Sequence, residues 1–255
     1  MTSSSARAVQ QYGATTGNLT ARMALHAYNT NPQDWFAFVA ERLPSGGDVL
    51  EVGAGTGALW SHVARRGMRL TLTDFSPAMC ARLREVEDAV VRRCDAARLP
   101  FGDGVFDTVI GNHMLYHLDD PRAALREFAR VLRPGGRVFV AVNGREHHTE
   151  ITALGPAIGR PDLTLSAVHN GITAETVPGM LARRFGSVTA ERYRSDLEVP
   201  GPEPVLAFLA SIATEPLTAA QESAARDLIR ARIAADGTFH VRKHTVLITA
   251  QHHQQ

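Results

Sequence analysis

Three glycines at every second position follow an acid and an apolar run in DVLEVGAGTGALW, residues 48–60. Gly53, Gly55 and Gly57 allow the backbone to turn tightly and to approach a ligand closely. If Ala58 is counted, the segment also satisfies the GxGxxA pattern of dinucleotide-binding proteins. The loop by itself therefore indicates a nucleotide-like ligand without saying which one.

Three acids accompany this loop and narrow the choice of ligand. Glu51 lies in the apolar run before the loop, and Asp74 and Asp95 end the next two predicted strands. A carboxylate accepts hydrogen bonds, so Asp74 suits two ribose hydroxyls and Asp95 suits the exocyclic amine of adenine. Glu51 would repel a pyrophosphate but attract a cation. Each acid alone could have a local structural role, but together they predict an adenosine that carries positive charge instead of phosphate.

Alternating strands and helices must position these residues. Apolar runs predict strands over 49–52, 69–74, 90–95, 104–112 and 137–143, with helices over 58–66, 76–89 and 121–132 between them. This order predicts a doubly wound α/β sheet whose ligands bind beyond the carboxyl ends of the strands. Asn18, Asp34 and Ser76 are predicted helix caps, the first two for helices over 19–28 and 35–43.

After Asn143 the alternation loosens. We expect an interrupted helix over 173–185, an extended segment over 187–199, helices over 203–212 and 219–235, and a closing strand over 238–250.

Composition excludes several classes of protein. The 255 residues carry a net charge of +1, so no polyanionic partner is expected, and the scattered arginines and single lysine, Lys243, are interpreted as genomic composition. Cys80 and Cys94 are too far apart for a metal or redox motif, and no metal is expected. The chain shows no apolar run long enough for a membrane span and no secretory signal at its start, which favours a cytoplasmic protein without a membrane partner.

Four segments in succession resemble the motifs of class I S-adenosylmethionine-dependent methyltransferases. They are DVLEVGAGTGAL, LTLTDFSPAMC, RRCDAARLPFGDGVFDTVIGNHMLYHLDD and ALREFARVLRPGGRVFVAVN, which together cover about residues 48–143. The bacterial small-molecule, type 11-like branch is the most similar. The resemblance implies a Rossmann-like sheet of seven strands with an antiparallel last strand. It also implies one domain over 1–255, with N-terminal lid helices in 1–43, a cofactor-binding core in 44–144, and a substrate lid with C-terminal strands in 145–255.

The resemblance also assigns cofactor contacts. Glu51 and the glycine loop would hold the methionine end, Asp74 the ribose and Asp95 the adenine edge. Asn112 would lie beside the methyl group, and Arg22 would reach the cofactor's carboxylate. The full set of implied cofactor-binding residues is Arg22, Glu51, Gly53, Ala54, Gly55, Asp74, Phe75, Met79, Asp95, Ala96, Asn112 and His117.

The implied reaction moves the methyl group of S-adenosylmethionine to an oxygen, nitrogen or carbon of a small molecule, a secondary metabolite or its precursor, and leaves S-adenosylhomocysteine. Where the acceptor must lose a proton, histidine is the natural base near neutral pH. The candidates are His113, after the fourth strand, and His147 and His148, after the fifth. For the last two, a solvated polar loop is the alternative.

Three other functions remain open. An NAD(P)-dependent oxidoreductase would place phosphate beside Glu51 and leave Asp95 without a task. A methyltransferase acting on a macromolecule would be expected to carry a basic stripe, which is missing, and no nucleic-acid partner is expected. A binding protein without activity would not need the intact glycines and acids. A monomer or a homodimer is expected.

Overall fold

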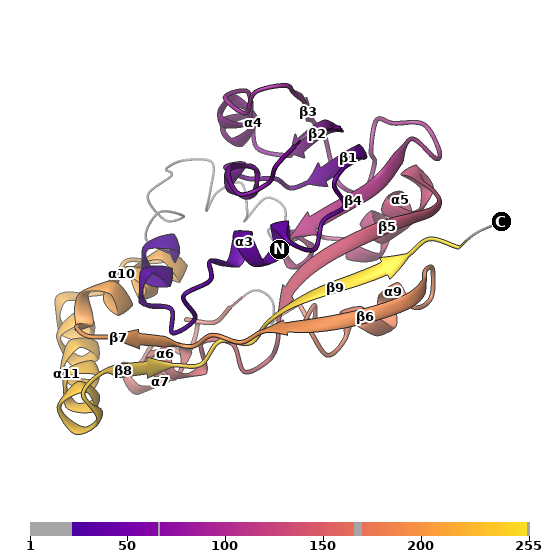
Figure 1. The fold of residues 1–255 in the computed structure, drawn as a ribbon. Coiled ribbons are helices and arrows are strands. Elements are labelled where there is room, and N and C mark those ends of the chain that lie inside the picture. The colour runs from indigo at the N-terminus through magenta and orange to yellow at the C-terminus, as the bar shows by residue number, and fades with distance from the viewer. Residues whose placement is uncertain (1–21, 66, 166–169, 254–255) are drawn as a thin grey trace.

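The computed structural model describes residues 22–65, 67–165 and 170–253, and its centre is a seven-stranded sheet of order β3-β2-β1-β4-β5-β9-β6 (Figure 1). Its strands are β1 Gly47–Val52, β2 Met68–Asp74, β3 Ala89–Arg93, β4 Phe106–Asn112, β5 Leu132–Asn143, β6 Gly186–Tyr193 and β9 Thr245–Gln251. The pairs among β1 to β5 are parallel, whereas β9 lies between β5 and β6 and is antiparallel to both. This arrangement confirms the predicted sheet and its antiparallel last strand.

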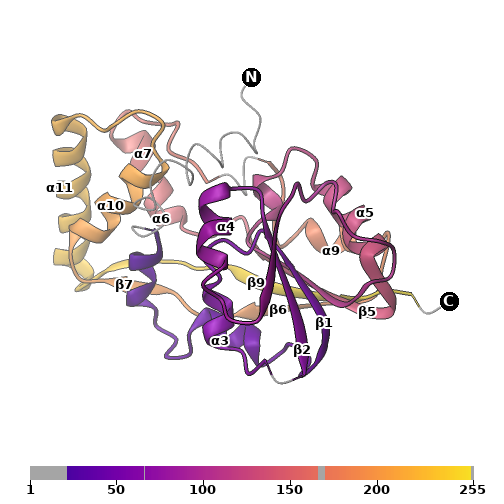
Figure 2. The same ribbon diagram turned by 90° about the horizontal axis from the view of Figure 1, so that it is seen from above.

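Helices cover both faces of the sheet, and in Figure 2 α3 and α4 lie on one side of the strands while α5 and α9 lie on the other. The helices are α3 Trp35–Ala40, α4 Pro77–Leu83, α5 Pro121–Val131, α6 Thr149–Thr152, α7 Leu154–Ala157, α9 Val177–Leu181, α10 Pro202–Ile212 and α11 Ala219–Asp236, with 3-10 turns η1 Leu25–Tyr28, η2 Ala58–Ser61 and η3 Leu115–His117. Asp34 and Ser76 cap α3 and α4, as predicted. The predicted cap Asn18 lies outside the described residues.

The predicted helix over 58–66 is wrong, because the chain makes only the single 3-10 turn η2 there. Leu59 and Trp60 are adjacent in sequence and are both buried against the sheet. The indole N–H of Trp60 donates to the Glu51 carboxylate at 2.6 Å. These contacts hold the segment close beneath β1, and the helical pattern of its side chains is overridden by packing.

The predicted extended segments over 187–199 and 238–250 are each broken into two strands. The C-terminal end of the first segment and the N-terminal end of the second leave the main sheet. They pair with each other as β7 Leu197–Val199 and β8 Phe239–Val241. At the break, the Asp196 carboxylate accepts the backbone N–H of Lys243 at 2.8 Å. Lys243 therefore lies at the corner where the chain passes from the small sheet into β9.

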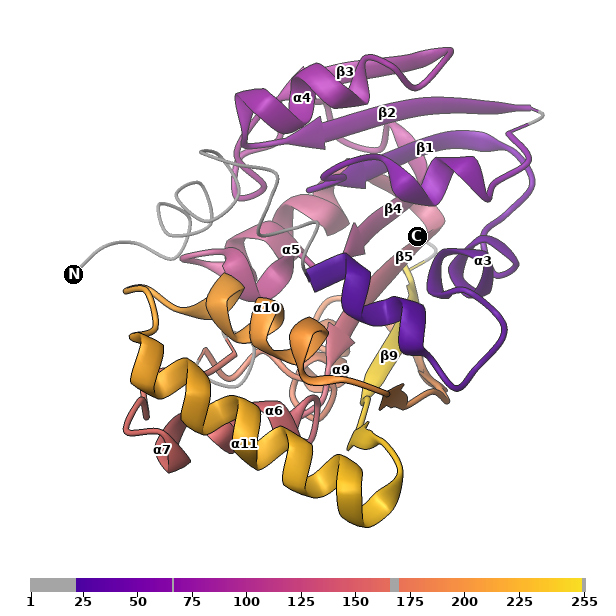
Figure 3. The same ribbon diagram turned by 90° about the vertical axis from the view of Figure 1, so that its left-hand side faces the viewer.

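The small sheet belongs to a second layer of structure, which we call the annex. It consists of β7, β8, α6, α7, α10 and α11, and its helices are labelled in Figure 3. Its apolar core is separate from the cores on the two faces of the main sheet, and Leu25 of η1 packs into it. The annex lies beyond the end of the main sheet at which the predicted ligand-binding residues gather, so it is placed to cover them.

Candidate active site

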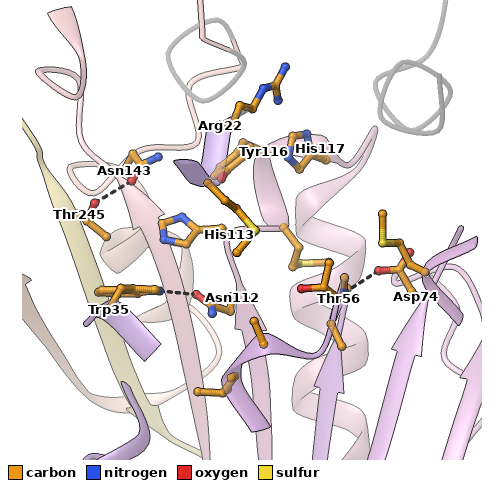
Figure 4. Close-up of a pocket in the computed structure, with 18 of the residues that line it drawn as sticks. Arg22, Trp35, Thr56, Asp74, Asn112, His113, Tyr116, His117, Asn143 and Thr245 are labelled. Atoms are coloured by element: carbon orange, nitrogen blue, oxygen red, sulfur yellow. Dashed lines mark hydrogen bonds between the residues drawn. The ribbon is translucent and has the colours of Figure 1, made fainter. Parts of the chain in front are cut away.

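A cavity of about 650 Å³ lies between the carboxyl ends of the strands and the annex. This volume is typical of sites that enclose small molecules. Every predicted site residue lines it: Arg22, Glu51, Gly53, Ala54, Gly55, Asp74, Phe75, Met79, Asp95, Ala96, Asn112, His113, His117, His147 and His148. Figure 4 shows Asp74 at one end of this region, Asn143 and Thr245 at the other, and His113 between them.

The glycine loop and Asp74 form one unit. The backbone N–H of Gly55 donates to one carboxylate oxygen of Asp74 at 3.0 Å, and the N–H of Ser76 donates to the other at 2.8 Å. Gly55 has φ +58°, and a Cβ built on it would meet no protein atom within 4 Å. Its open face therefore borders the cavity, where a ligand can come close to the backbone.

Glu51 is an acid buried at the end of β1. Its side chain lines the cavity, the residue is only 2% exposed, and one oxygen accepts the Trp60 indole N–H. Burial raises the pKa of Glu51 to about 8, and the negative charge of Asp74 adds to the effect. The carboxyl group is thus protonated at neutral pH until a positive charge lies next to it.

Asp95 and its neighbours line the cavity near β3. One Asp95 oxygen accepts the backbone N–H of Ala97 at 2.9 Å, and Ala96 is buried. Met79, on α4, is buried as well, whereas Phe75 is 44% exposed. These four members of the predicted cofactor-binding set thus combine polar groups with two side chains that can pack on a flat ring.

Asn112 and His113 follow β4 at the middle of the cavity. The Asn112 Oδ1 accepts the indole N–H of Trp35 at 3.3 Å, which ties α3 to the end of the sheet (Figure 4). His113 has φ +55°, in the left-handed region. Residues held in this region are strained, and such strain is concentrated at functional sites. The His113 and Trp35 rings lie next to each other, tilted, with 5.3 Å between their centroids.

His147 and His148 are buried against the cavity, so the alternative of a solvated polar loop is wrong. They are 6% and 2% exposed, and their rings stack with centroids 3.8 Å apart. Burial lowers the pKa of His113 and of His148 to about 3, and it lowers the pKa of His147 well below its usual range. All three imidazoles are therefore neutral at neutral pH.

Arg22 lines the cavity from the N-terminal side and contacts the annex. Its guanidinium donates to the backbone oxygen of Ser211 at 2.6 Å and to the Ser211 hydroxyl at 3.1 Å. His117 lines the same end, and its pKa is lowered to about 4 by burial and by the charge of Arg22. Whether Arg22 reaches a cofactor carboxylate stays a prediction.

Several cavity residues escaped the sequence-based prediction. Lys243, interpreted there as composition, lines the cavity together with Asn29, His26, Phe208 and Ile212. They come from η1, the annex and the corner before β9, where no motif marks them. The sequence offers one signal for Lys243: it is the only lysine, and every other long basic side chain is an arginine.

The residues present fit S-adenosylmethionine. The buried carboxyl group of Glu51 lies at the loop where the positive methionine end is expected. The open face of Gly55 leaves room for the methionine end. Asp74 and Asp95 supply acceptors for hydroxyl and amine donors. Among the described residues, no group of three or more His, Cys, Asp and Glu side chains is arranged to hold a metal ion.

Comparison with known proteins agrees with this fit. A family model described as "Methyltransferase domain" matches residues 50–140. A phosphatidylethanolamine N-methyltransferase of Cereibacter sphaeroides is 35% identical over 142 residues, which cover 52% of this chain and 68% of that protein. The chain belongs to the S-adenosylmethionine-dependent methyltransferases.

Other relatives of this methyltransferase match less of their own length. The demethylmenaquinone methyltransferase of Mycobacterium marinum is 42% identical over 115 residues, covering 45% of this chain and 48% of that protein. The chain thus spans about half the length of the demethylmenaquinone methyltransferases that it matches.

Solved structures share the fold of this methyltransferase at low sequence identity. Haemonchus contortus phosphoethanolamine N-methyltransferase 2, which holds S-adenosylhomocysteine, has a TM-score of 0.60 at 16% identity and covers 100% of this chain and 61% of that one. The cyclase SpnF has a TM-score of 0.59 at 23% identity and covers 99% and 98%. Because this neighbour is a cyclase, the fold alone does not specify the reaction.

Proposed function

We propose that the chain transfers the methyl group of S-adenosylmethionine to a nucleophilic atom of a small molecule, a secondary metabolite or its precursor. The observation that carries this proposal is one continuous cavity. The three acids at the strand ends line one part of it, and a histidine-lined part lies next to them. Two reactants could thus meet inside the protein, away from water. The family membership supports the choice of cofactor.

The proposed cofactor contacts use the geometry of the strand ends. Glu51 would hold the methionine ammonium, Asp74 the ribose hydroxyls, and Asp95 with Ala96 the adenine edge. Phe75 and Met79 would pack on the ring. A second group of residues is proposed to complete the cofactor site: Arg22, Gly53, Ala54, Gly55, Asn112 and His117.

When bound, S-adenosylmethionine supplies a methyl group on a positively charged sulfur, so no metal is required to activate it. The protein then has to align the acceptor and exclude water, and alignment contributes roughly 7–11 kcal/mol to such reactions. A general base works best with a pKa near the working pH. Because the pKa of His113 and His148 is about 3, these imidazoles are weak bases there. We propose that His113, His147 and His148 orient the acceptor as neutral hydrogen-bonding groups.

We also propose that the whole chain forms one methyltransferase domain, with the core in 44–144 and covering segments in 1–43 and 145–255. Trp35, Phe208 and Ile212, from the covering segments, line the cavity and support this division. A cytoplasmic location is proposed with it, supported by Cys80 and Cys94, which are both free thiols. Among the described residues, no helix has the length and apolar character needed to cross a bilayer.

Calorimetry followed by an assay of methyl transfer tests the proposal. We expect the purified chain to bind S-adenosylmethionine and S-adenosylhomocysteine but not NADH or NADPH. Labelled methyl from the cofactor should then appear in at least one acceptor from a panel of phenolic, amine and enol metabolites. Preferential binding of a dinucleotide would overturn the proposal. Cofactor binding without transfer to any acceptor would favour a binding protein or a cyclase.

A further inference from the structure

The proposed cofactor contacts leave a group of nitrogen-bearing side chains unused. Lys243 lines the cavity although the residue is only 3% exposed. Its ammonium donates to Asn29 Oδ1 at 2.7 Å, and its Nζ lies 3.4 Å from His26 Nδ1. These are neutral partners, since burial and the charge of Lys243 hold the pKa of His26 well below its usual value. The Tyr193 ring, 5.2 Å from Nζ to its centroid, is a further uncharged contact, so the cavity contains a cation whose close contacts carry no negative charge.

Asp34 and Asp196, the two carboxylates whose charge acts on the pKa of Lys243, bind other groups. Asp34 caps α3 through the N–H groups of Phe36 and Ala37. Asp196 accepts the backbone N–H of Lys243 and lies 3.7 Å from His240. No ion pair within 4.0 Å joins Lys243 to an acid among the residues that the structure describes. A buried cation without such a partner is costly, and an anionic ligand would relieve that cost.

His148 and His113 point to a ligand independently. Both ring nitrogens of His148 and the Nδ1 of His113 are buried without a hydrogen-bond partner among the described residues. Buried polar atoms in proteins are nearly always hydrogen-bonded, so each unpaired atom calls for an explanation. Both residues line the cavity, and both hold left-handed backbone conformations, with φ +57° and +55°.

The walls around these polar groups are apolar and partly aromatic. Phe208, from α10, packs edge-on against His148 with ring centroids 5.2 Å apart. Trp35 lies 5.3 Å from His113, and Ile212 also lines this part. Walls of this kind suit a flat conjugated molecule.

We propose that this part of the cavity binds the acceptor through an acidic hydroxyl group, a phenol or an enol, whose oxygen Lys243 stabilises as the anion while His148 hydrogen-bonds to the acceptor. The inference deepens the proposed function and rests on it. Burial lowers the pKa of Lys243 to about 8, so the amine is largely protonated at neutral pH. A hydroxyl can enter the cavity uncharged and release its proton to solvent water, which leaves the anion beside the Lys243 ammonium. A carboxylate would instead have to give up its hydration shell for a single cation.

A coloured phenol tests this subsite without any transfer reaction. 4-Nitrophenol is added to protein saturated with S-adenosylhomocysteine, one pH unit below the pKa of the free probe, where about a tenth of it is ionised. We expect half or more of the bound probe to be ionised, seen as nitrophenolate absorbance, because a nearby cation lowers the pKa of an acid. Lys243→Met should abolish this shift. The matched control Arg242→Met removes a neighbouring cation that pairs with Glu150 outside the cavity, and it should leave the shift intact.

The outcomes separate this inference from the proposed function. Calorimetry on the same proteins should give S-adenosylhomocysteine affinities within about twofold of one another, since Lys243 is not among the proposed cofactor contacts. A wild-type protein that binds no cofactor contradicts the proposed function. If the cofactor binds but 4-nitrophenol does not bind, stays neutral or ionises equally in Lys243→Met, the subsite is overturned. Tighter, Lys243-dependent binding of 4-nitrobenzoate would also overturn the choice of a hydroxyl.

A second measurement needs no variant. Because Lys243 is the only lysine, protein made with 13C-labelled lysine gives a single side-chain Cε resonance. We expect 4-nitrophenol to shift this resonance and to raise the pKa of the amine, because the bound anion favours the charged form. Nitrobenzene, which has the same ring without the hydroxyl, should do neither. An unmoved resonance with bound nitrophenol would contradict the contact with Lys243.

Discussion

Glu51 makes cofactor binding depend on pH if it holds the methionine ammonium as proposed. Its pKa of about 8 means that the free protein keeps the proton at pH 6 to 7. The cationic ligand favours the carboxylate, so binding must release that proton. Affinity should therefore rise as the pH increases from 6 to about 7.5, by up to about tenfold per unit; near pH 8 the ligand's own α-amino group begins to lose its charge. Calorimetry in buffers of different ionisation enthalpy would count the released proton.

The control for this prediction is Glu51→Gln, which keeps an acceptor for the Trp60 indole but cannot titrate. Its affinity should be weaker at pH 8 and should change little with pH. An unchanged slope in this variant would show that a group other than Glu51 supplies the pH dependence.

Asp74 should contribute to cofactor affinity through charge-assisted hydrogen bonds to the ribose. We expect Asp74→Ala to weaken binding of S-adenosylmethionine by about 1–3 kcal/mol, measured by calorimetry. Asp227→Ala, which removes an exposed acid on α11, is the control and should bind normally. Because Asp74 also accepts the N–H groups of Gly55 and Ser76, thermal unfolding must accompany the measurement. Wild-type affinity in Asp74→Ala would count against the assigned pocket.

At the scale of elements, the annex should unfold separately from the main sheet because it has its own apolar core. Ile229, on α11, is fully buried in that core. Ile229→Ala should destabilise the annex by about 2–5 kcal/mol, while the neighbouring Leu228→Ala, at an exposed position, should change stability by about 0.5 kcal/mol or less. Hydrogen exchange should become faster in α10, α11 and β8 but not in β1 to β5. Equal acceleration throughout would show a single cooperative unit.

The parallel strands β1 to β5 were predictable from sequence because an apolar run and neighbouring turn or capping residues mark each of them. Asp34 and Ser76 cap helices where their types and positions indicate. The helix expected over 58–66 failed because Leu59 and Trp60 are fixed by contacts with β1 and the core, which local pattern does not contain. The annex was missed because three-residue strands such as β7 and β8 exist only through their pairing.

The candidate site also has one side that could be predicted from the sequence and one that could not. Its cofactor side follows a motif, and those residues could be placed at strand ends by the rule for parallel sheets. Its other side joins His26 and Asn29 with Phe208 and Lys243, which come from distant parts of the chain. These residues meet only through the pairing of β7 with β8 and the docking of η1 on the annex. Neither a motif nor a residue spacing in the sequence predicts that these side chains lie close together.

For the whole molecule, charge distribution separates a small acceptor from a nucleic acid. The net charge is +1, and arginines such as Arg42, Arg69 and Arg130 are paired with acids. A protein that contacts six to ten phosphates loses about 10³–10⁵ in affinity between about 50 and 200 mM salt. We expect binding of 4-nitrophenol to the cofactor-loaded protein to change by less than about twofold over that range, because the responsible cation is buried. Mixed tRNA or duplex DNA should not compete with the probe. Competition that disappears at the higher salt would instead favour a macromolecular acceptor.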